Sequence, residues 1–85
     1  MELLRTERFK KDFKHLPLDV QERTEKALGV FAQNPRHPSL RAKKMEGAAG
    51  IWELRVSDTD RITFQLADDG VLLRRIGTHD VLRRP

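Results

Sequence analysis

The stretch that decides the fold is residues 51–66, which read Ile-Trp-Glu-Leu-Arg-Val-Ser-Asp-Thr-Asp-Arg-Ile-Thr-Phe-Gln-Leu. Apolar residues at 52, 54 and 56 alternate with residues 51, 53 and 55, and those at 62, 64 and 66 alternate with residues 61, 63 and 65. This period of two predicts two half-buried β-strands. Four turn-forming residues, Ser-Asp-Thr-Asp, separate them, so the stretch predicts an antiparallel hairpin.

The apolar residues also predict the register of this hairpin, because cross-strand partners share a face of the sheet. Pairing Trp52 with Phe64 sets the other partners, which are Leu54 with Ile62, Glu53 with Thr63, and Arg55 with Arg61. Directly opposed arginines repel each other by up to about 1 kcal/mol. A phosphate bound between them would relieve that repulsion.

A third strand is expected over residues 71–77, after an Asp-Asp-Gly turn at 68–70. If that turn has three residues, the arginine-bearing face continues through residue 75 and, if the strand extends, through residues 77 and 79. This face is turned away from the helices. We expect it to hold Arg55, Arg61, Arg75 and His79.

The residues before these strands predict a helical hairpin. Thr6 can cap a first helix that ends at Pro17, with an apolar stripe of Phe9, Phe13 and Leu16. A second helix is expected from about Asp19 to Asn34, and its inward residues are Val20, Thr24, Ala27, Leu28 and Phe31. Residues 2–5 can add a short edge strand. The predicted fold is α+β, with the order β-α-α-β-β-β and the helical hairpin packed on one face of a small antiparallel sheet.

Residues 35–50 contain two prolines and two glycines without a sustained period, so they are predicted to be a long surface loop. Residues 36–44 within this loop form the densest positive stretch of the chain and contain no acidic residue. The basic residues in this stretch are Arg36, His37, Arg41, Lys43 and Lys44. Such a stretch favours contact with a polyanion, although a solvated surface is the common alternative.

Composition limits the class of protein. A core of this size cannot be divided, so residues 1–85 are expected to form a single domain. The apolar residues include no run near ~20 residues and no signal-peptide core, so we expect a cytoplasmic protein without a membrane span. The chain has no cysteine, and its three histidines lack i,i+4 spacing, so neither a metal nor another cofactor is expected. The net charge of +4 favours polyanionic partners without requiring them.

Five segments resemble, in order and spacing, the RelE/ParE toxins of bacterial toxin–antitoxin pairs. These segments are Pro38–Leu40, Lys43–Gly47, Ile51–Val56, Asp60–Ile62 and Arg75–His79. The resemblance spans essentially the whole chain. It implies the toxin of a type II toxin–antitoxin system that inhibits translation. The implied activity is that of a ribosome-dependent endoribonuclease, which cuts messenger RNA without a metal when a 2′-hydroxyl attacks the adjacent phosphate.

The resemblance also implies site residues. The ending Gly-Thr-His at 77–79 most resembles the YafQ-type branch, which implies His79 as a catalytic histidine and Asp60 as a participating aspartate. Arg61 matches the arginine that binds the scissile phosphate. The chain departs from its relatives at Leu82, near the place of a common tyrosine, and at Arg55, where the YafQ branch has a histidine. The implied catalytic residues are His79, Arg61, Arg55 and Asp60, and the implied RNA-binding residues are Arg41, Lys43, Lys44, Arg75 and Arg83.

Structural alternatives stay open for several of these residues. His79 could be an exposed histidine near the end of the chain, and Asp60 could simply form the turn. Arg61 could form an ion pair with Glu53 or Asp60, and the lysines could be solvated. His15 is expected to be structural, and the role of His37 is left open.

The resemblance implies three kinds of partner: a cognate antitoxin, messenger RNA with the ribosome, and operator DNA only through the antitoxin complex. An acidic antitoxin would be attracted to a basic toxin. Two rival functions share the fold, namely a ParE-like poison of DNA gyrase without chemistry and a catalytically silent homologue that acts with its antitoxin as a repressor. Fold alone does not decide among them.

Overall fold

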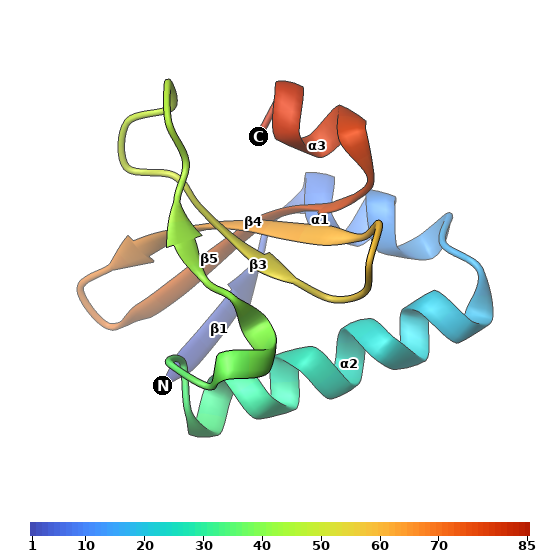
Figure 1. The fold of residues 1–85 in the computed structure, drawn as a ribbon, viewed down its shortest axis with the longest axis horizontal. Helices are drawn as coiled ribbons and strands as arrows, with labels where there is room; N and C mark the ends of the chain where they lie inside the picture. Colours follow the sequence, from blue (N-terminus) through green and yellow to red (C-terminus); the bar gives the residue numbers. More distant parts are fainter.

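The computed structural model describes residues 1–85 as a five-stranded sheet with helices on both faces (Figure 1). The elements are β1 (Glu2–Arg5), α1 (Glu7–Lys14), α2 (Leu18–Gln33), the 3-10 helix η1 (Pro38–Leu40), β2 (Lys43–Lys44), β3 (Trp52–Arg55), β4 (Arg61–Ala67), β5 (Gly70–Gly77) and α3 (His79–Arg83). The predicted α+β order is confirmed, with η1, β2 and α3 added to it.

The strands lie in the order β1-β5-β4-β3-β2. Strands β2 to β5 pair antiparallel, whereas β1 pairs parallel to β5, so the sheet is mixed rather than wholly antiparallel. Glu2 of β1 pairs with Gly70 of β5. A Cβ atom on residue 70 would lie 2.2 Å from the Glu2 carbonyl oxygen, so β1 approaches β5 this closely only because residue 70 is a glycine.

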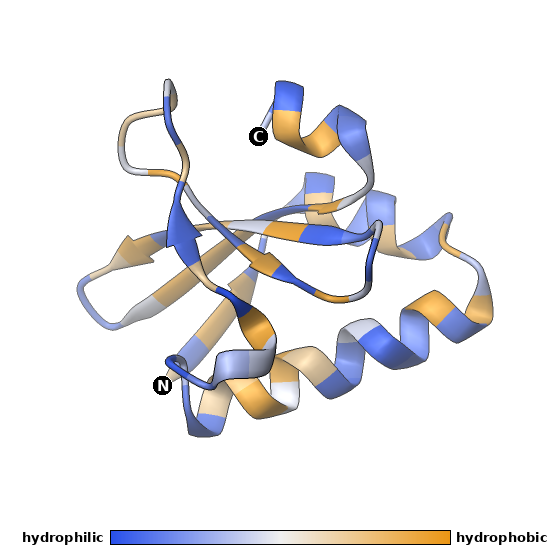
Figure 2. Cartoon of the chain, viewed as in Figure 1, coloured by the Kyte–Doolittle hydropathy of each residue, from blue (hydrophilic) through white to orange (hydrophobic).

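The predicted register of β3 and β4 is confirmed at all four pairs, including Arg55 opposite Arg61. In β5 a bulge shifts the pairing, so that Phe64 faces Leu73 while Thr63 faces Arg75. Figure 2 shows apolar and polar residues following one another along β3 and β4. The period of two therefore describes this part of the chain correctly.

The predicted end of the third strand at Gly77 is confirmed, and the conditional extension to His79 does not occur. β5 ends at Gly77, and the chain turns into α3 at His79. This turn buries Val81, which is 1% exposed and lies so close to β5 that a Cβ on Gly77 would be 3.0 Å from its Cγ1 atom. The gain from burying Val81 favours the helical turn over an extended strand.

The core lies between the helical hairpin and one face of the sheet. Phe9 of α1 and Leu28 and Phe31 of α2 are buried there, against Phe64 and other apolar residues of the strands. Figure 1 shows α2 and α3 on opposite sides of the sheet. The predicted packing of the hairpin on one sheet face is confirmed, and α3 contacts β4 and β5 from the other side.

The predicted N-cap of α1 is confirmed. The Thr6 hydroxyl accepts a hydrogen bond from the backbone N–H of Phe9 at 3.0 Å and donates one to the Arg74 carbonyl at 2.9 Å. One side chain therefore caps α1 and ties it to β5. No helix in the structure combines the length and the hydropathy that a membrane span requires.

The prediction of a long surface loop over residues 35–50 is wrong in part. The 3-10 helix η1 buries Leu40, which is 2% exposed, and β2 extends the sheet beside β3. Lys43 pairs with Glu53, and Lys44 pairs with Trp52. A strand of two residues is too short to produce a detectable alternation in sequence, and it forms here because β3 offers it a free edge.

Candidate active site

The opposed arginines lie beside the turn between β3 and β4, and they share one hydrogen-bond acceptor. Arg55 Nε donates to the Ser57 carbonyl oxygen at 3.3 Å, and Arg61 Nη1 donates to the same oxygen at 2.5 Å. This shared carbonyl, together with the ion pair between Arg55 and Asp58, offsets the repulsion between the two cations. The opposition of the two arginines is therefore not in itself evidence for a bound phosphate.

The two arginines differ in what remains available for a ligand. Arg55 also forms an ion pair with Asp58, whose side chain is 90% exposed. Arg61 forms no ion pair, neither with Glu53 nor with Asp60, and its only other bond is from Nη1 to the Asp60 carbonyl at 3.0 Å. The Nε and Nη2 atoms of Arg61 make no hydrogen bond within the chain, so they can form a two-donor contact with a phosphate.

Arg75 lies on the Thr63 row of the sheet, as predicted, but it is held by Asp12 of α1. Its Nε and Nη2 atoms donate to the two Asp12 carboxylate oxygens at 3.0 and 3.1 Å, and both side chains are only 13% exposed. The Ile76 backbone N–H donates to the same carboxylate at 3.3 Å, and Arg75 Nη1 donates to the Arg84 carbonyl. The hydrogen bond with Asp12 raises the pKa of Arg75, against the opposing effect of burial. All three nitrogens of this guanidinium are therefore occupied.

Sequence reasoning overlooked Asp12. A possible signal is that Asp12 is the single acidic residue of the basic run from Arg8 to Lys14. Its partner lies 63 residues away, which no helical period reveals. Beyond the end of β1, Asp12 also accepts a hydrogen bond from the Ile76 backbone N–H, so it binds the edge of β5 as well as Arg75.

Asp60 is buried and belongs to the turn. Its carboxylate Oδ2 accepts from the Ser57 hydroxyl at 2.7 Å, while its own backbone N–H donates to that hydroxyl oxygen at 3.1 Å. Its carbonyl oxygen accepts from the N–H groups of Val56 and Ser57. These reciprocal bonds are those of a turn-forming aspartate, and they hold the Ser57 carbonyl between the two arginines.

His79 is the first residue of α3, and it is exposed. Its imidazole makes no hydrogen bond within the chain, so both ring nitrogens are free to contact a ligand. It follows Gly77, the cross-strand partner of Arg61, by two residues. Partner Cα atoms lie about 5 Å apart and two residues span at most about 7 Å, so the Cα atoms of His79 and Arg61 are within about 12 Å. The two residues therefore lie near one another in the fold.

The largest cleft, about 570 Å³ in volume, lies between α1, the start of α2, the end of β5 and the start of α3. Asp60, Arg75 and His15 line it, together with Thr78 and Asp80. Its lining does not include His79, Arg55 or Arg61. The predicted catalytic residues are thus not gathered in one cavity, and the two unpaired groups, Arg61 and His79, lie outside this cleft. No group of three or more His, Asp or Glu side chains is arranged to hold a metal ion.

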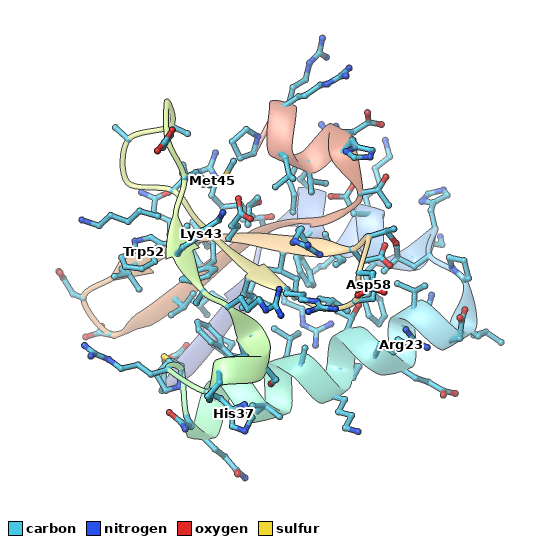
Figure 3. The ribbon with its side chains drawn as sticks, in the orientation of Figure 1. Arg23, His37, Lys43, Met45, Trp52 and Asp58 are labelled. Atoms are coloured by element: carbon cyan, nitrogen blue, oxygen red, sulfur yellow. The ribbon has the colours of Figure 1, made fainter.

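The predicted RNA-binding residues are distributed over different surfaces. Lys43 shares the face of Glu53 and therefore of the arginines, whereas Lys44 shares the opposite face with Trp52. Lys44 Nζ lies 5.6 Å from the centre of the Trp52 ring, a cation–π contact. Figure 3 shows Lys43 and Trp52 at one end of the hairpin and Asp58 at the other. The two lysines therefore point to opposite faces of the sheet.

Arg41 directly follows η1, whereas Arg83 belongs to α3, which packs on the sheet face that carries the arginines. Arg41 is exposed, adopts a left-handed backbone with φ of 46°, and lines a cavity with Trp52. Arg83 of α3 lines a cleft of about 310 Å³ with Arg8, Arg75, Arg84 and Asp80. Of the five predicted RNA-binding residues, Lys43 is the exposed strand residue on the face that carries Arg61, and Arg83 is exposed on α3, which packs on that face.

Comparison with solved structures finds several toxins that resemble this chain over nearly their whole length. A chain of the RelB–RelE antitoxin–toxin complex from Methanococcus jannaschii is 21% identical, with 95% of each chain covered and a TM-score of 0.75. The YoeB/ParE toxin from Agrobacterium tumefaciens is 15% identical, with 93% of this chain and 99% of the toxin covered and a TM-score of 0.76. YafQ from E. coli is 17% identical, with 95% and 96% covered and a TM-score of 0.75.

These similarities cover nearly the whole of each chain. No family model matches the sequence, and no curated protein matches it significantly. The identities are low, so the similarity concerns the arrangement of the elements. The chain has the fold of the RelE/ParE-like toxins.

Proposed function

We propose that this protein is the toxin of a type II toxin–antitoxin system and an endoribonuclease that cuts messenger RNA on the ribosome. The observation that carries the proposal is Arg61, an arginine with two free donors and no acidic partner, close to the exposed His79 in a RelE/ParE-like fold. A cognate antitoxin is the proposed partner. The complexes of RelB with RelE and of DinJ with YafQ, in which proteins of this fold were solved with their antitoxins, support that partner.

The proposed reaction is a transesterification within the RNA. The 2′-oxygen attacks the adjacent phosphorus, the bond to the 5′-oxygen of the next nucleotide breaks, and a cyclic phosphate and a 5′-hydroxyl result. The proton leaves the 2′-oxygen and one is delivered to the 5′-oxygen, so the step needs no cofactor. The Nε and Nη2 atoms of Arg61 bind the phosphate oxygens, whose negative charge grows in the transition state.

His79 moves a proton at one of the two reacting oxygens, because an imidazole can serve as a general acid or as a general base. Asp60 acts indirectly in this proposal. It holds the turn whose Ser57 carbonyl orients Arg61, so Asp60 is a positioning residue. Lys43, on the same face as Arg61, contributes a phosphate contact along the bound strand.

The test is single-turnover cleavage of ribosome-bound messenger RNA by the wild type, His79→Ala and His37→Ala. His37 is a matched control, since it is an exposed histidine that caps η1 and its ring nitrogen is bonded only to Ser39. Loss of a general acid or base costs about 10²–10⁴ in rate, so His79→Ala should lose at least a hundredfold while His37→Ala keeps the wild-type rate. Circular dichroism checks that both variants fold.

The same experiment separates the rival functions. A His79→Ala protein that cuts at the wild-type rate would refute the role of this residue. A wild type that inhibits DNA supercoiling and never cuts messenger RNA would identify a gyrase poison. A wild type that does neither, and binds operator DNA only together with its antitoxin, would identify a catalytically silent repressor.

A further inference from the structure

Two adjoining cavities lie at the end of the sheet farthest from the Arg55–Arg61 turn. One of about 250 Å³ and one of about 450 Å³ share four lining residues, Pro35, Arg36, Ala42 and Trp52. We name this continuous depression the Trp52 groove. It lies between the end of α2, η1, the N-terminus and the β4–β5 hairpin, which Figure 1 shows close to one another.

The floor of the Trp52 groove is apolar and rigid. The Trp52 and Phe64 rings stack with their centres 6.1 Å apart, and Phe31 packs against Phe64 at 5.0 Å. Met1 and Leu66 border the floor and are more than half exposed, at 54% and 58%. Exposed apolar side chains around an aromatic floor leave surface that a partner can bury with a gain in free energy.

The rim of the groove is basic on one side. Arg36, Arg41 and His37 line the larger cavity, and Lys44 lies against the Trp52 ring. Neither cavity is lined by an acidic residue. Asp68 and Asp69 lie in the turn between β4 and β5, beyond Leu66, at the end of the groove opposite η1. The electrostatic complement is therefore a segment whose carboxylates face the η1 side and whose apolar side chain enters the groove.

The groove does not overlap the proposed active site. Trp52 and Phe64 share the face that packs on the helices, whereas Arg61 lies on the opposite face and at the other end of the hairpin. A ligand in the groove would leave Arg61 and His79 uncovered. The groove is thus a binding surface that is separate from the proposed active site.

We propose that the Trp52 groove receives an acidic segment of the antitoxin that carries an apolar anchor residue. This inference rests on the proposed function for the identity of the partner. Its chemistry follows from the groove itself. Seven of the nine residues that line the smaller cavity are hydrophobic, which favours an aliphatic or aromatic anchor over a sugar–phosphate backbone.

The chain carries its own reporter for this test. Trp52 is the only tryptophan and there is no tyrosine, so intrinsic fluorescence reports on this groove alone. The probe is a synthetic ten-residue peptide with a central leucine pair flanked by glutamates. One control peptide has lysines in place of the glutamates, and another has serines in place of the leucines. We expect a saturable fluorescence change with the first peptide and at least tenfold weaker binding of both controls.

Variants at exposed positions locate the binding. Leu66→Glu and Arg36→Glu should each weaken binding of the acidic peptide at least tenfold. Leu18→Glu should not weaken it, because Leu18 is 77% exposed on α2 and lines neither cavity. Arg36→Glu should also improve binding of the lysine peptide. Equal binding of the acidic and lysine peptides, or unchanged binding by Leu66→Glu, would overturn the proposal.

A decamer of uridine serves as the nucleic-acid arm. If the decamer binds more tightly than the acidic peptide, and Leu66→Glu weakens binding of the decamer, the groove binds RNA and the proposal is wrong. None of these measurements uses RNA cleavage. If the wild type binds the acidic peptide but never cuts messenger RNA, the inference about the groove stands and the proposed function is wrong.

Discussion

The ion pair between Asp12 and Arg75 leads to a quantitative prediction. If the pair is strong, Arg75 stabilises the fold and is not available to bind RNA. Asp12→Ala removes the acceptor of two guanidinium bonds and of the Ile76 N–H. It leaves Arg75 with one bond, to the Arg84 carbonyl. We expect the variant to fold and to be markedly less stable than the wild type.

The size of the loss follows from the geometry. Breaking a buried ion pair by removing one partner costs about 3–5 kcal/mol. We take the lower end, on the order of 3 kcal/mol, because the long Arg75 side chain keeps its bond to Arg84 and can turn its charge toward water. For a domain of this size each kcal/mol lowers the melting temperature by about 4–8 °C, so Asp12→Ala should melt roughly 12–24 °C below the wild type.

A double-mutant cycle isolates the pair. Urea unfolding of Asp12→Ala, Arg75→Ala and the double variant should give a coupling free energy of about 2 kcal/mol. The exposed pair of Glu7 and Lys10 on α1 is the matched control, since its side chains are 93% and 58% exposed. Its coupling should be about 0.2–0.5 kcal/mol.

A coupling below about 0.5 kcal/mol for Asp12 and Arg75 would refute the reasoning. It would mean that Arg75 is solvated and free to bind phosphate. The complementary measurement is the salt dependence of RNA binding by Arg75→Ala. If Arg75 is a structural residue, the slope should equal that of the wild type, because no phosphate contact is lost.

Three further predictions concern the arginine face. Lys43→Ala should lower the salt dependence of RNA binding by about 0.7 log units, because one single-strand phosphate contact is lost, whereas Lys44→Ala should leave it unchanged. Equal effects of the two substitutions would show that the sheet face on which each lysine lies does not decide its contact with RNA. Arg61→Lys should lose nearly as much cleavage as Arg61→Ala, because an ammonium cannot reproduce the two-donor fork, and a lysine variant with most of the activity would mean that only charge is needed. Asp60→Asn keeps an acceptor for the Ser57 hydroxyl, so it should retain most of the cleavage rate; a hundredfold loss with unchanged stability would make Asp60 a catalytic group instead.

The pH profile of cleavage bears on His79 without interference from Arg75. The pKa of Arg75 is raised above its ordinary value, so the stability that this group contributes is fully present below its unfolded pKa. That stability is lost only as the pH rises through the raised, folded-state pKa. Any change in rate between pH 5.5 and 8.5 must therefore come from another group.

Local patterns were enough to predict most of the framework from the sequence. The Thr6 cap, the helical hairpin, the three long strands and the pairing of Arg55 with Arg61 depend on residues near in sequence or on apolar partners that must share a face. These constraints act on every residue of an element. A slip by one residue would turn the whole apolar set to the other face, and the four-residue turn limits larger shifts.

The candidate site depended more on tertiary contacts. The sequence placed Arg61 on an open face, but it could not show that Asp12 captures Arg75 from 63 residues away, or that burial of Val81 ends β5 before His79. The opposite directions of Lys43 and Lys44 follow from a strand of two residues, too short to leave a periodic signal. Single long-range contacts of this kind have no repeating pattern. Their free energy arises only when the folded chain brings the partners together.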